Sequence, residues 1–370
     1  MVIRKISYYR VIVSLCLFMF LLSPVFGDEI SAVSFDKELP ENNIVTIQPD
    51  SLRILHNPLT GWVLYASMGV DAADFWAQYD HMYIPELGHN VSVTDYAHTL
   101  YIRASWTDFN PQEDVYGWKI DSNLRAYIEG AYQRNMRLAF RVVVDSRDKR
   151  TEFTPQFVKD AGAKGFMNKG KWSPYSDDSV FQKYYTKFVK ALAKDFNDPS
   201  KVEFIDGFGL GKWGEYHTMI YSTGDDTPKK AVFDWVTDIY SQAFDKVPVV
   251  INYHRWIGAG KDWVDDEHFA ADSEEMLEEA IKKGYSLRHD AFGMTTYYGS
   301  WERRFAKKYR NICPIIMEGG WIVKSHSYWQ DPRGYRKDSH EDVRRGEFDD
   351  SKEAHVNMMD FRFGDTELLI

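Results

Sequence analysis

The sequence predicts a single (β/α)₈ barrel. Eight short apolar segments alternate with helical segments, as is typical of parallel strands joined by helical crossovers. Connections from a helix into a strand are short, such as Asn197–Lys201 and Asp245–Val247. Connections from a strand into a helix are long, such as Asp145–Asp177 and Gly211–Thr227. One end of the sheet therefore carries the elaborated loops, and in a closed barrel this is the carboxyl end, where active sites lie.

Each expected strand is an apolar or β-branched run bounded by turn residues. In chain order the strands are Gly61–Tyr65, Thr99–Ala104, Arg137–Val144, a run that begins at Val202, Pro248–Tyr253, a weaker run at Ala291–Tyr297, a run around Ile315, and His355–Phe361. The expected helices are amphipathic and cover Ile120–Asn135, Asp178–Phe196, Lys229–Phe244, Ser273–Lys283, Trp301–Tyr309 and His340–Glu353. Residues 362–370 are too few for a closing helix, so we expect the barrel to lack its last helix or a C-terminal domain.

The first 27 residues have the pattern of a secretory signal peptide. A basic start is followed by the apolar run Val11–Leu22, which is short for a membrane span, and Gly27 offers a small residue before a cut. An uncleaved anchor is the alternative. We expect residues 28–50 to form a polar leader, residues 51–370 to form the barrel, and the mature chain to be secreted or periplasmic without stable membrane insertion.

Composition narrows the choice of partners. The 55 acidic residues outnumber the 45 basic ones, which argues against nucleic acid and anionic membranes. The 12 Trp and 23 Tyr residues suit a carbohydrate cleft, although large aromatic cores are a common alternative. Cys313 is alone once Cys16 leaves with the signal, and we interpret it as an inert core thiol.

Two glutamates stand out because each follows an apolar strand at the elaborated end. Glu215 comes after the fourth strand, and Glu318 ends the seventh strand 103 residues later. Both are close to glycines and a tryptophan. Glycoside hydrolysis needs two such acids, one to protonate the leaving oxygen and one to attack or support the anomeric carbon. The alternative for either residue alone is an ordinary carboxylate at a strand end.

At this point the sequence resembles the clan A retaining glycoside hydrolases, which have an acid/base Glu after strand four and a nucleophile Glu after strand seven. Ser105–Trp118 is similar to the stretch after strand two of the family 42 β-galactosidases. Gly211–His217, together with Asn57–Trp62, more closely resembles a bacterial family of exported, largely uncharacterised putative glycosidases. The resemblance spans residues 55–365.

The resemblance implies a retaining mechanism with Glu215 as the acid/base and Glu318 as the nucleophile, and a tyrosine, Tyr297 or Tyr298, on the nucleophile. The chain departs from the clan at Gly214, where an Asn usually holds the sugar 2-hydroxyl. This departure leaves open a catalytically inactive carbohydrate-binding barrel. In either case we expect an oligo- or polysaccharide as the partner.

Other residues of the same face are candidates for substrate binding. Arg103 and Arg141 could keep the nucleophile ionised or pair with structural acids. His217 and His254 could orient a carboxylate, touch substrate, or be structural, and Asp145 and Asn252 are plausible hydroxyl binders. The candidate sugar platforms are Trp106, Trp213, Trp256, Trp301 and Trp321.

No cofactor or metal is expected. The 11 His residues do not form a zinc pattern. Gly209–Gly214 matches a dinucleotide fingerprint formally, but a loop follows it where a helix should begin. There is no G-x-S-x-G elbow. A barrel of another chemistry, such as a metal-dependent hydrolase, is the remaining alternative.

Overall fold

The computed structural model describes residues 59–66, 68–85, 87–147, 151–261, 268–292, 297–319 and 340–361. The chain divides into two units, and all of these residues belong to the second, Ile54–Ile370. The expected signal peptide (1–27), the polar leader (28–50), Trp321 and residues 362–370 lie outside the described residues. No helix in the described ranges is both long enough and apolar enough to cross a membrane.

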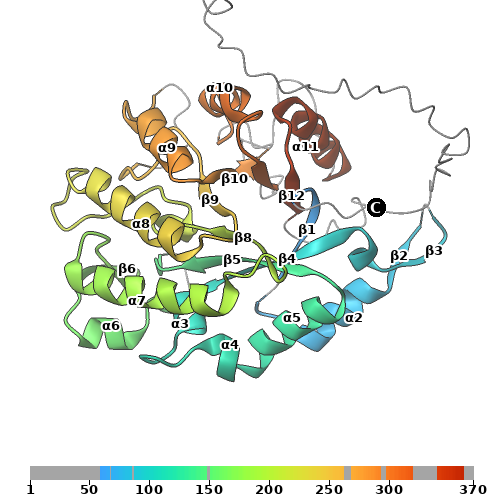
Figure 1. Ribbon diagram of the computed structural model, residues 1–370, viewed down its shortest axis with the longest axis horizontal. Helices are drawn as coiled ribbons and strands as arrows, with labels where there is room; N and C mark the ends of the chain where they lie inside the picture. The colour runs from blue at the N-terminus through green and yellow to red at the C-terminus, as the bar shows by residue number, and fades with distance from the viewer. Residues whose placement is uncertain are drawn as a thin grey trace, which may run out of the picture. The chain divides into compact units, whose positions relative to one another are not determined.

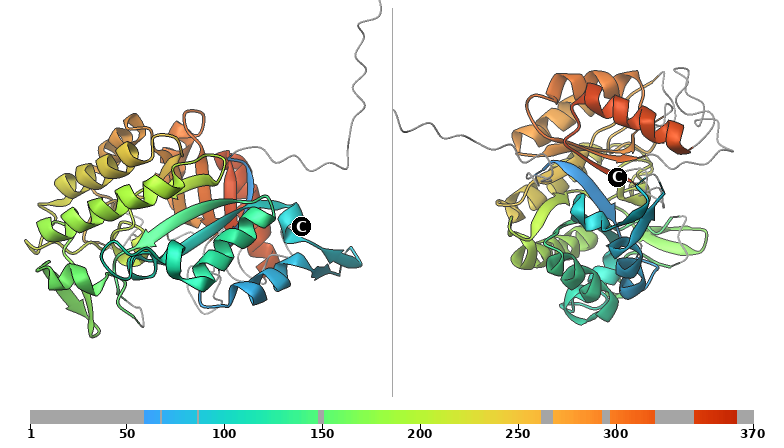
Figure 2. Two further views of the ribbon diagram at one scale, coloured as in Figure 1. Left: turned by 60° about the horizontal axis from the view of Figure 1, so that its bottom comes forward. Right: turned by 90° about the vertical axis from the view of Figure 1, so that its right-hand side faces the viewer.

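The described chain forms a closed barrel of parallel strands, which confirms the predicted fold (Figure 1). Its strands are β1 (Gly61–Tyr65), β4 (Ala97–Ser105), β5 (Arg137–Val143), β8 (Val202–Asp206), β9 (Val249–Asn252), β10 (Ser286–Phe292), β11 (Ile315–Gly319) and β12 (Met358–Phe361). The first strand, β1, closes the barrel by pairing with both β12 and β4, as Figure 2 shows.

Helices cover the outside of the barrel (Figure 1). The longer ones are α2 (Ala72–Asp80), α5 (Ser122–Gln133), α7 (Ser179–Phe196), α8 (Lys229–Ala243), α9 (Ser273–Lys282), α10 (Ser300–Tyr309) and α11 (His340–Ala354). Short helices occupy Val93–Asp95, Trp106–Phe109 (α3), Gly117–Ile120 (α4), Gln156–Asp160 (α6) and Lys212–Gly214. Two hairpins project from the loops and pair β2 (Met82–Ile84) with β3 (His89–Val91), and β6 (Gly165–Asn168) with β7 (Lys171–Pro174).

The sixth barrel strand was placed too late by the sequence pattern. It is β10, Ser286–Phe292, rather than Ala291–Tyr297. The polar run Arg288-His289-Asp290 hides it, because these side chains are buried in the structure although their residue types are usually exposed.

The inside of the barrel is built in layers. Side chains of one strand face the interior at every second residue. An apolar layer consists of Val63, Tyr101, Ala139, Phe204, Val250, Ile316 and Met358. Two residues further along each strand the sequence has Tyr65, Arg103, Arg141, Asp206, Asn252, Glu318 and Asp360. The barrel interior therefore changes from apolar to charged one layer before its carboxyl end.

Candidate active site

Two buried arginines connect the charged layer. Arg141 pairs with Asp206 at 2.5 Å and with Asp290 at 2.7 Å. Arg288 pairs with Asp290 at 2.9 Å and lies above the ring of Tyr101, 4.5 Å from its centre. All five residues are buried. Since buried charges require partners, this network fixes the floor of the candidate site.

Glu318 lies in this floor at the end of β11. Its side chain is fully buried, and its Oε2 accepts a hydrogen bond from Nη2 of Arg288 at 2.7 Å. The same guanidinium nitrogen donates to Oδ2 of Asp360, at 2.8 Å, on the neighbouring strand β12. A charge-assisted hydrogen bond of this length holds the Glu318 carboxyl group in one orientation.

Glu215 is held through its main chain. Its carbonyl oxygen accepts hydrogen bonds from Nδ2 of Asn252 and Nε2 of His254, both at 3.1 Å. Burial, with a smaller effect of nearby His217, keeps the pKa of His254 well below its usual value. The ring is therefore neutral, with its hydrogen on Nε2, because Nδ1 accepts from the Trp256 amide at 3.2 Å. Asn252 and His254 thus position Glu215.

The Glu215 side chain has looser partners. Arg103 Nη2 lies 3.6 Å from Oε1, His217 Nε2 lies 3.5 Å from Oε2, and Arg141 Nη1 lies 3.9 Å from Oε1. The carboxyl group is only slightly exposed, at 5%. It is held within reach of cations but not locked by a short hydrogen bond from any of these three, which suits a group that exchanges protons.

Arg103 lies beside Glu215 and carries a largely buried positive charge. Burial lowers its pKa, but Tyr65 and the charges of Glu215 and Glu318 outweigh burial, so the net shift is upward. Its guanidinium also donates to the carbonyl oxygen of Trp213 at 2.5 Å. Arg103 therefore contacts both the side chain of Glu215 and the loop that carries it.

The loop that carries Glu215 is wound tightly. Trp213 (φ 59°), Gly214 (φ 73°), Tyr216 (φ 62°) and Thr218 (φ 51°) all have left-handed backbone conformations. Such conformations are strained for residues other than glycine and concentrate at functional sites. A Cβ atom on Gly214 would lie 3.2 Å from the Val143 side chain. A side chain at position 214 would therefore be both strained and crowded.

The remaining predicted residues fall into two groups. Trp213 is half-buried beside Glu215, and its ring is 5.8 Å from that of His217. Tyr297 is half-buried and packs with Trp256 and Ala259. These residues lie near the glutamate loop, and their contact with a substrate stays a prediction.

The second group lies away from the two glutamates. Trp106 is fully buried against Tyr185 and Phe188 of α7, so it is a core residue and not a sugar platform. Tyr298 is buried, and its hydroxyl group bonds to Tyr253 at 3.2 Å instead of reaching a glutamate.

Two further predicted residues are occupied by structural contacts. Asp145 forms an ion pair with Arg147, at 2.7 Å from its Nε, and accepts from the Ser173 hydroxyl. Trp301 is buried and stacks on Phe305 with ring centres 5.2 Å apart. None of these contacts involves Glu215 or Glu318.

Sequence reasoning missed the acids and the arginine that support Glu318. They are Asp206, Arg288, Asp290 and Asp360. The available signal for Asp206 and Asp360 was the two-residue alternation, since they lie two residues beyond Phe204 and Met358 of the apolar layer. For Arg141, the structure favours the structural alternative, because it pairs with Asp206 and Asp290.

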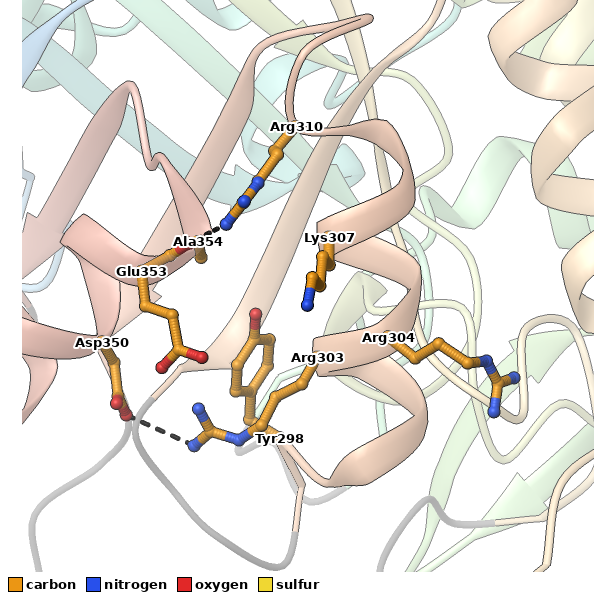
Figure 3. Close-up of a pocket in the computed structure, with 8 residues that line it drawn as sticks. All are labelled: Tyr298, Arg303, Arg304, Lys307, Arg310, Asp350, Glu353 and Ala354. Carbon is orange, nitrogen blue, oxygen red and sulfur yellow. Dashed lines mark hydrogen bonds and ion pairs between the residues drawn. The ribbon is translucent and has the colours of Figure 1, made fainter.

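A cavity of about 430 Å³ lies away from this site, between α10 and α11 on the outside of the barrel (Figure 3). Arg303 and Lys307 point towards it, and Arg303 pairs with Asp350 at 3.3 Å.

In the part of the chain that the structure describes, no group of His, Cys, Asp and Glu could hold a metal ion. Burial raises the pKa of the Cys313 thiol to about 11, so it is protonated at neutral pH.

No family model matches the chain, and no curated protein matches it. Solved structures with a similar chain path include the exo-β-1,4-mannosidase Op5Man5 from Opitutaceae bacterium strain TAV5, at 13% identity and a TM-score of 0.48. That match covers 85% of this chain and 54% of the mannosidase, so the chain spans about half of that protein's length.

Two ceramide glycosidases are also similar. Endo-glycoceramidase II from Rhodococcus sp. has 13% identity and a TM-score of 0.46, with 82% of this chain and 72% of that chain covered. An endogalactoceramidase has 12% identity and a TM-score of 0.49, with 82% and 70% covered. These neighbours are glycoside hydrolases, and at such identities the likeness concerns the fold.

Proposed function

We propose that the protein is a glycoside hydrolase that works outside the cytoplasm on an oligo- or polysaccharide. Glu215 is the general acid/base and Glu318 is the nucleophile. The observation that carries this proposal is the pair of buried glutamates, Glu215 and Glu318, at the carboxyl end of a closed barrel. The segment at residues 1–27 supports export.

The different surroundings of the two acids support their different roles. Glu318 is fixed by the 2.7 Å hydrogen bond from Arg288, as a nucleophile needs for in-line attack. Glu215 has only longer side-chain contacts, to Arg103 and His217, so its carboxyl group can release and recover a proton. Trp213, on the same loop, offers a half-buried aromatic ring next to it.

In the first step Glu318 attacks the anomeric carbon while Glu215 gives its proton to the leaving oxygen. In the second step Glu215 takes a proton from water, and the hydroxyl displaces Glu318. A retaining enzyme of this kind has its two carboxyl groups about 5–5.5 Å apart, whereas an inverting pair is about 6.5–9.5 Å apart. A crystal structure with a separation in the inverting range would overturn the assignment of Glu318 as nucleophile.

Azide rescue tests the two roles. We expect Glu318→Ala to abolish turnover on every cleaved substrate, because no intermediate can form. Glu215→Ala should still react with substrates that have good leaving groups, but it should hydrolyse the intermediate slowly. Added azide needs no general base, so it should restore turnover and give a glycosyl azide of retained configuration. An inverted glycosyl azide from the Glu215 variant, together with a retained one from the Glu318 variant, would reverse the roles.

A carbohydrate-binding barrel without catalysis is the second candidate. The crowded, left-handed position of Gly214 favours it, because no side chain there can hold a sugar hydroxyl. This candidate predicts glycan binding by calorimetry without any product, and binding that is unchanged by Glu318→Gln. Cleavage of any glycan that depends on Glu318 would exclude it.

A further inference from the structure

The nucleophile candidate shares its cation with a second acid. Nη2 of Arg288 donates to Glu318 Oε2 at 2.7 Å and to Asp360 Oδ2 at 2.8 Å. Glu318 and Asp360 are register partners on β11 and β12. The side chains of all three residues are fully buried. Two buried carboxyl groups therefore compete for one nitrogen.

The buried layer does not balance if every acid is ionised. Three cations, Arg103, Arg141 and Arg288, face five carboxyl groups, namely Asp206, Glu215, Asp290, Glu318 and Asp360. Uncompensated negative charge is expensive in a buried site, and a carboxyl group there takes up a proton instead.

Donor counts indicate which acid holds the proton. Asp290 accepts from Arg141, Arg288 and Asn252, and the two arginines hold its pKa far below the usual range against the opposing effect of burial. Asp360 accepts from Arg288 through its Oδ2, and its Oδ1 is buried with no hydrogen-bond partner among the described residues.

The surroundings of Asp360 agree with this assignment. Burial, opposed by Arg288 and reinforced by the negative charge of Glu318, raises the pKa of Asp360 to about 8. The charged groups facing it are Arg288 and Asp290 from β10 and Glu318 from β11. Its register partner on β1, Val63, is uncharged.

We propose that Asp360 is a positioning residue for Glu318, protonated while Glu318 is an anion and deprotonated when Glu318 carries the glycosyl group. Protonated Asp360 leaves Arg288 to orient the nucleophile. Once Glu318 is esterified, the Asp360 carboxylate becomes the partner of Arg288. The idea rests on the proposed function, since it requires Glu318 to be the nucleophile.

The proton balance of the step is explicit. A Glu318 oxygen forms a bond to the anomeric carbon, the bond from that carbon to the leaving oxygen breaks, and its electron pair goes to the leaving group. The negative charge of Glu318 disappears, and Asp360 releases its proton to water. Hydrolysis regenerates the Glu318 anion, and Asp360 takes up a proton again.

The first experiment measures the resting protein by infrared difference spectroscopy. We expect the C=O stretching band of a protonated carboxyl group in the wild type at neutral pH, absent in Asp360→Asn and lost from the wild type above about pH 9. Asp350→Asn, at a buried acid that pairs with Arg303 on the outer helices, is the matched control and should keep the band. Identical spectra for wild type and Asp360→Asn would overturn the proposal.

The second experiment measures proton release during covalent trapping. The probes are 2,4-dinitrophenyl 2-deoxy-2-fluoro glycosides of glucose, galactose and mannose, whose leaving group departs as a phenolate without a proton. The background is Glu215→Gln, so that Glu215 cannot contribute. We expect about one proton released per labelled Glu318, and none when Asp360→Asn is added.

The outcomes separate the two ideas. Two results would overturn the role of Asp360 and leave the glycosidase proposal intact. One is labelling of Glu318 without proton release. The other is equal proton release with and without the Asp360→Asn substitution. Failure of all three probes to label Glu318, with the infrared band present, counts against the proposed function and with it against Asp360 as partner of a nucleophile.

Discussion

Replacing Asp360 by Asn should change how the stability of the protein depends on pH. The folded protein raises the pKa of Asp360 from 3.8 to about 8, chiefly through burial. Between these two values the folded state binds a proton that the unfolded state has already released. The contribution to stability is fully present below the unfolded value and is lost as pH rises towards about 8.

The size of the effect follows from this linkage. One proton of difference changes the free energy of unfolding by about 1.4 kcal/mol per pH unit. Asn has the same shape as the protonated acid but does not titrate. Relative to wild type, Asp360→Asn should therefore gain roughly 3 kcal/mol between about pH 5 and about pH 7.

The assay is urea unfolding followed by tryptophan fluorescence at a series of pH values, with the free energy of unfolding compared between the two proteins. Asp350→Asn keeps Asp360 and should therefore retain the wild-type dependence. Parallel stability curves for wild type and Asp360→Asn would refute the reasoning, because they would mean that Asp360 titrates alike in the folded and unfolded states.

Three further substitutions test the site. Trp106→Ala should lower the free energy of unfolding by about 3–5 kcal/mol in denaturant titrations and leave KM unchanged, since the ring lies in the core. A raised KM with normal stability would instead indicate that Trp106 is a sugar platform. Gly214→Ala should lower the free energy of unfolding by roughly 1–2 kcal/mol, because φ at this position is 73°. An unchanged melting temperature would contradict the left-handed conformation of Gly214. Arg288→Met should cost about 3–5 kcal/mol and lower kcat more than KM; normal kcat would exclude Arg288 as the partner of the nucleophile.

The barrel could be predicted because its strands carry the apolar pattern that burial on both faces requires. Helix α7 was expected at Asp178–Phe196 and occupies Ser179–Phe196, since its apolar stripe and its Asp178 cap are both local signals. Strand β10 was predicted too late in the sequence because Arg288 and Asp290 are polar residues that point into the barrel. Their partners come from other strands, so no local pattern indicates that they are buried.

The two glutamates were found because Glu318 lies near the end of an apolar strand and Glu215 follows another apolar strand after a glycine-rich loop. Their supporting contacts were less visible. That Asn252 and His254 bind the main chain of Glu215, instead of a sugar, depends on the path of the loop after β8. A tryptophan directly after a strand can turn towards the barrel mouth or towards the outer helices, and the sequence does not distinguish the two. Trp106 was therefore predicted as a sugar platform, although it packs against α7.

The hydrogen bonds to the Glu215 carbonyl also order events during folding. Glu215 follows β8, but the side chains that hold its main chain come 37 and 39 residues later. A folding intermediate with strands only as far as β8 would lack these donors, and the left-handed turns of the loop would have nothing to hold them. The loop of Glu215 can therefore be held only once β9 has joined β8, and the pair of glutamates is complete only when β10 and β11, which carry Arg288 and Glu318, have followed.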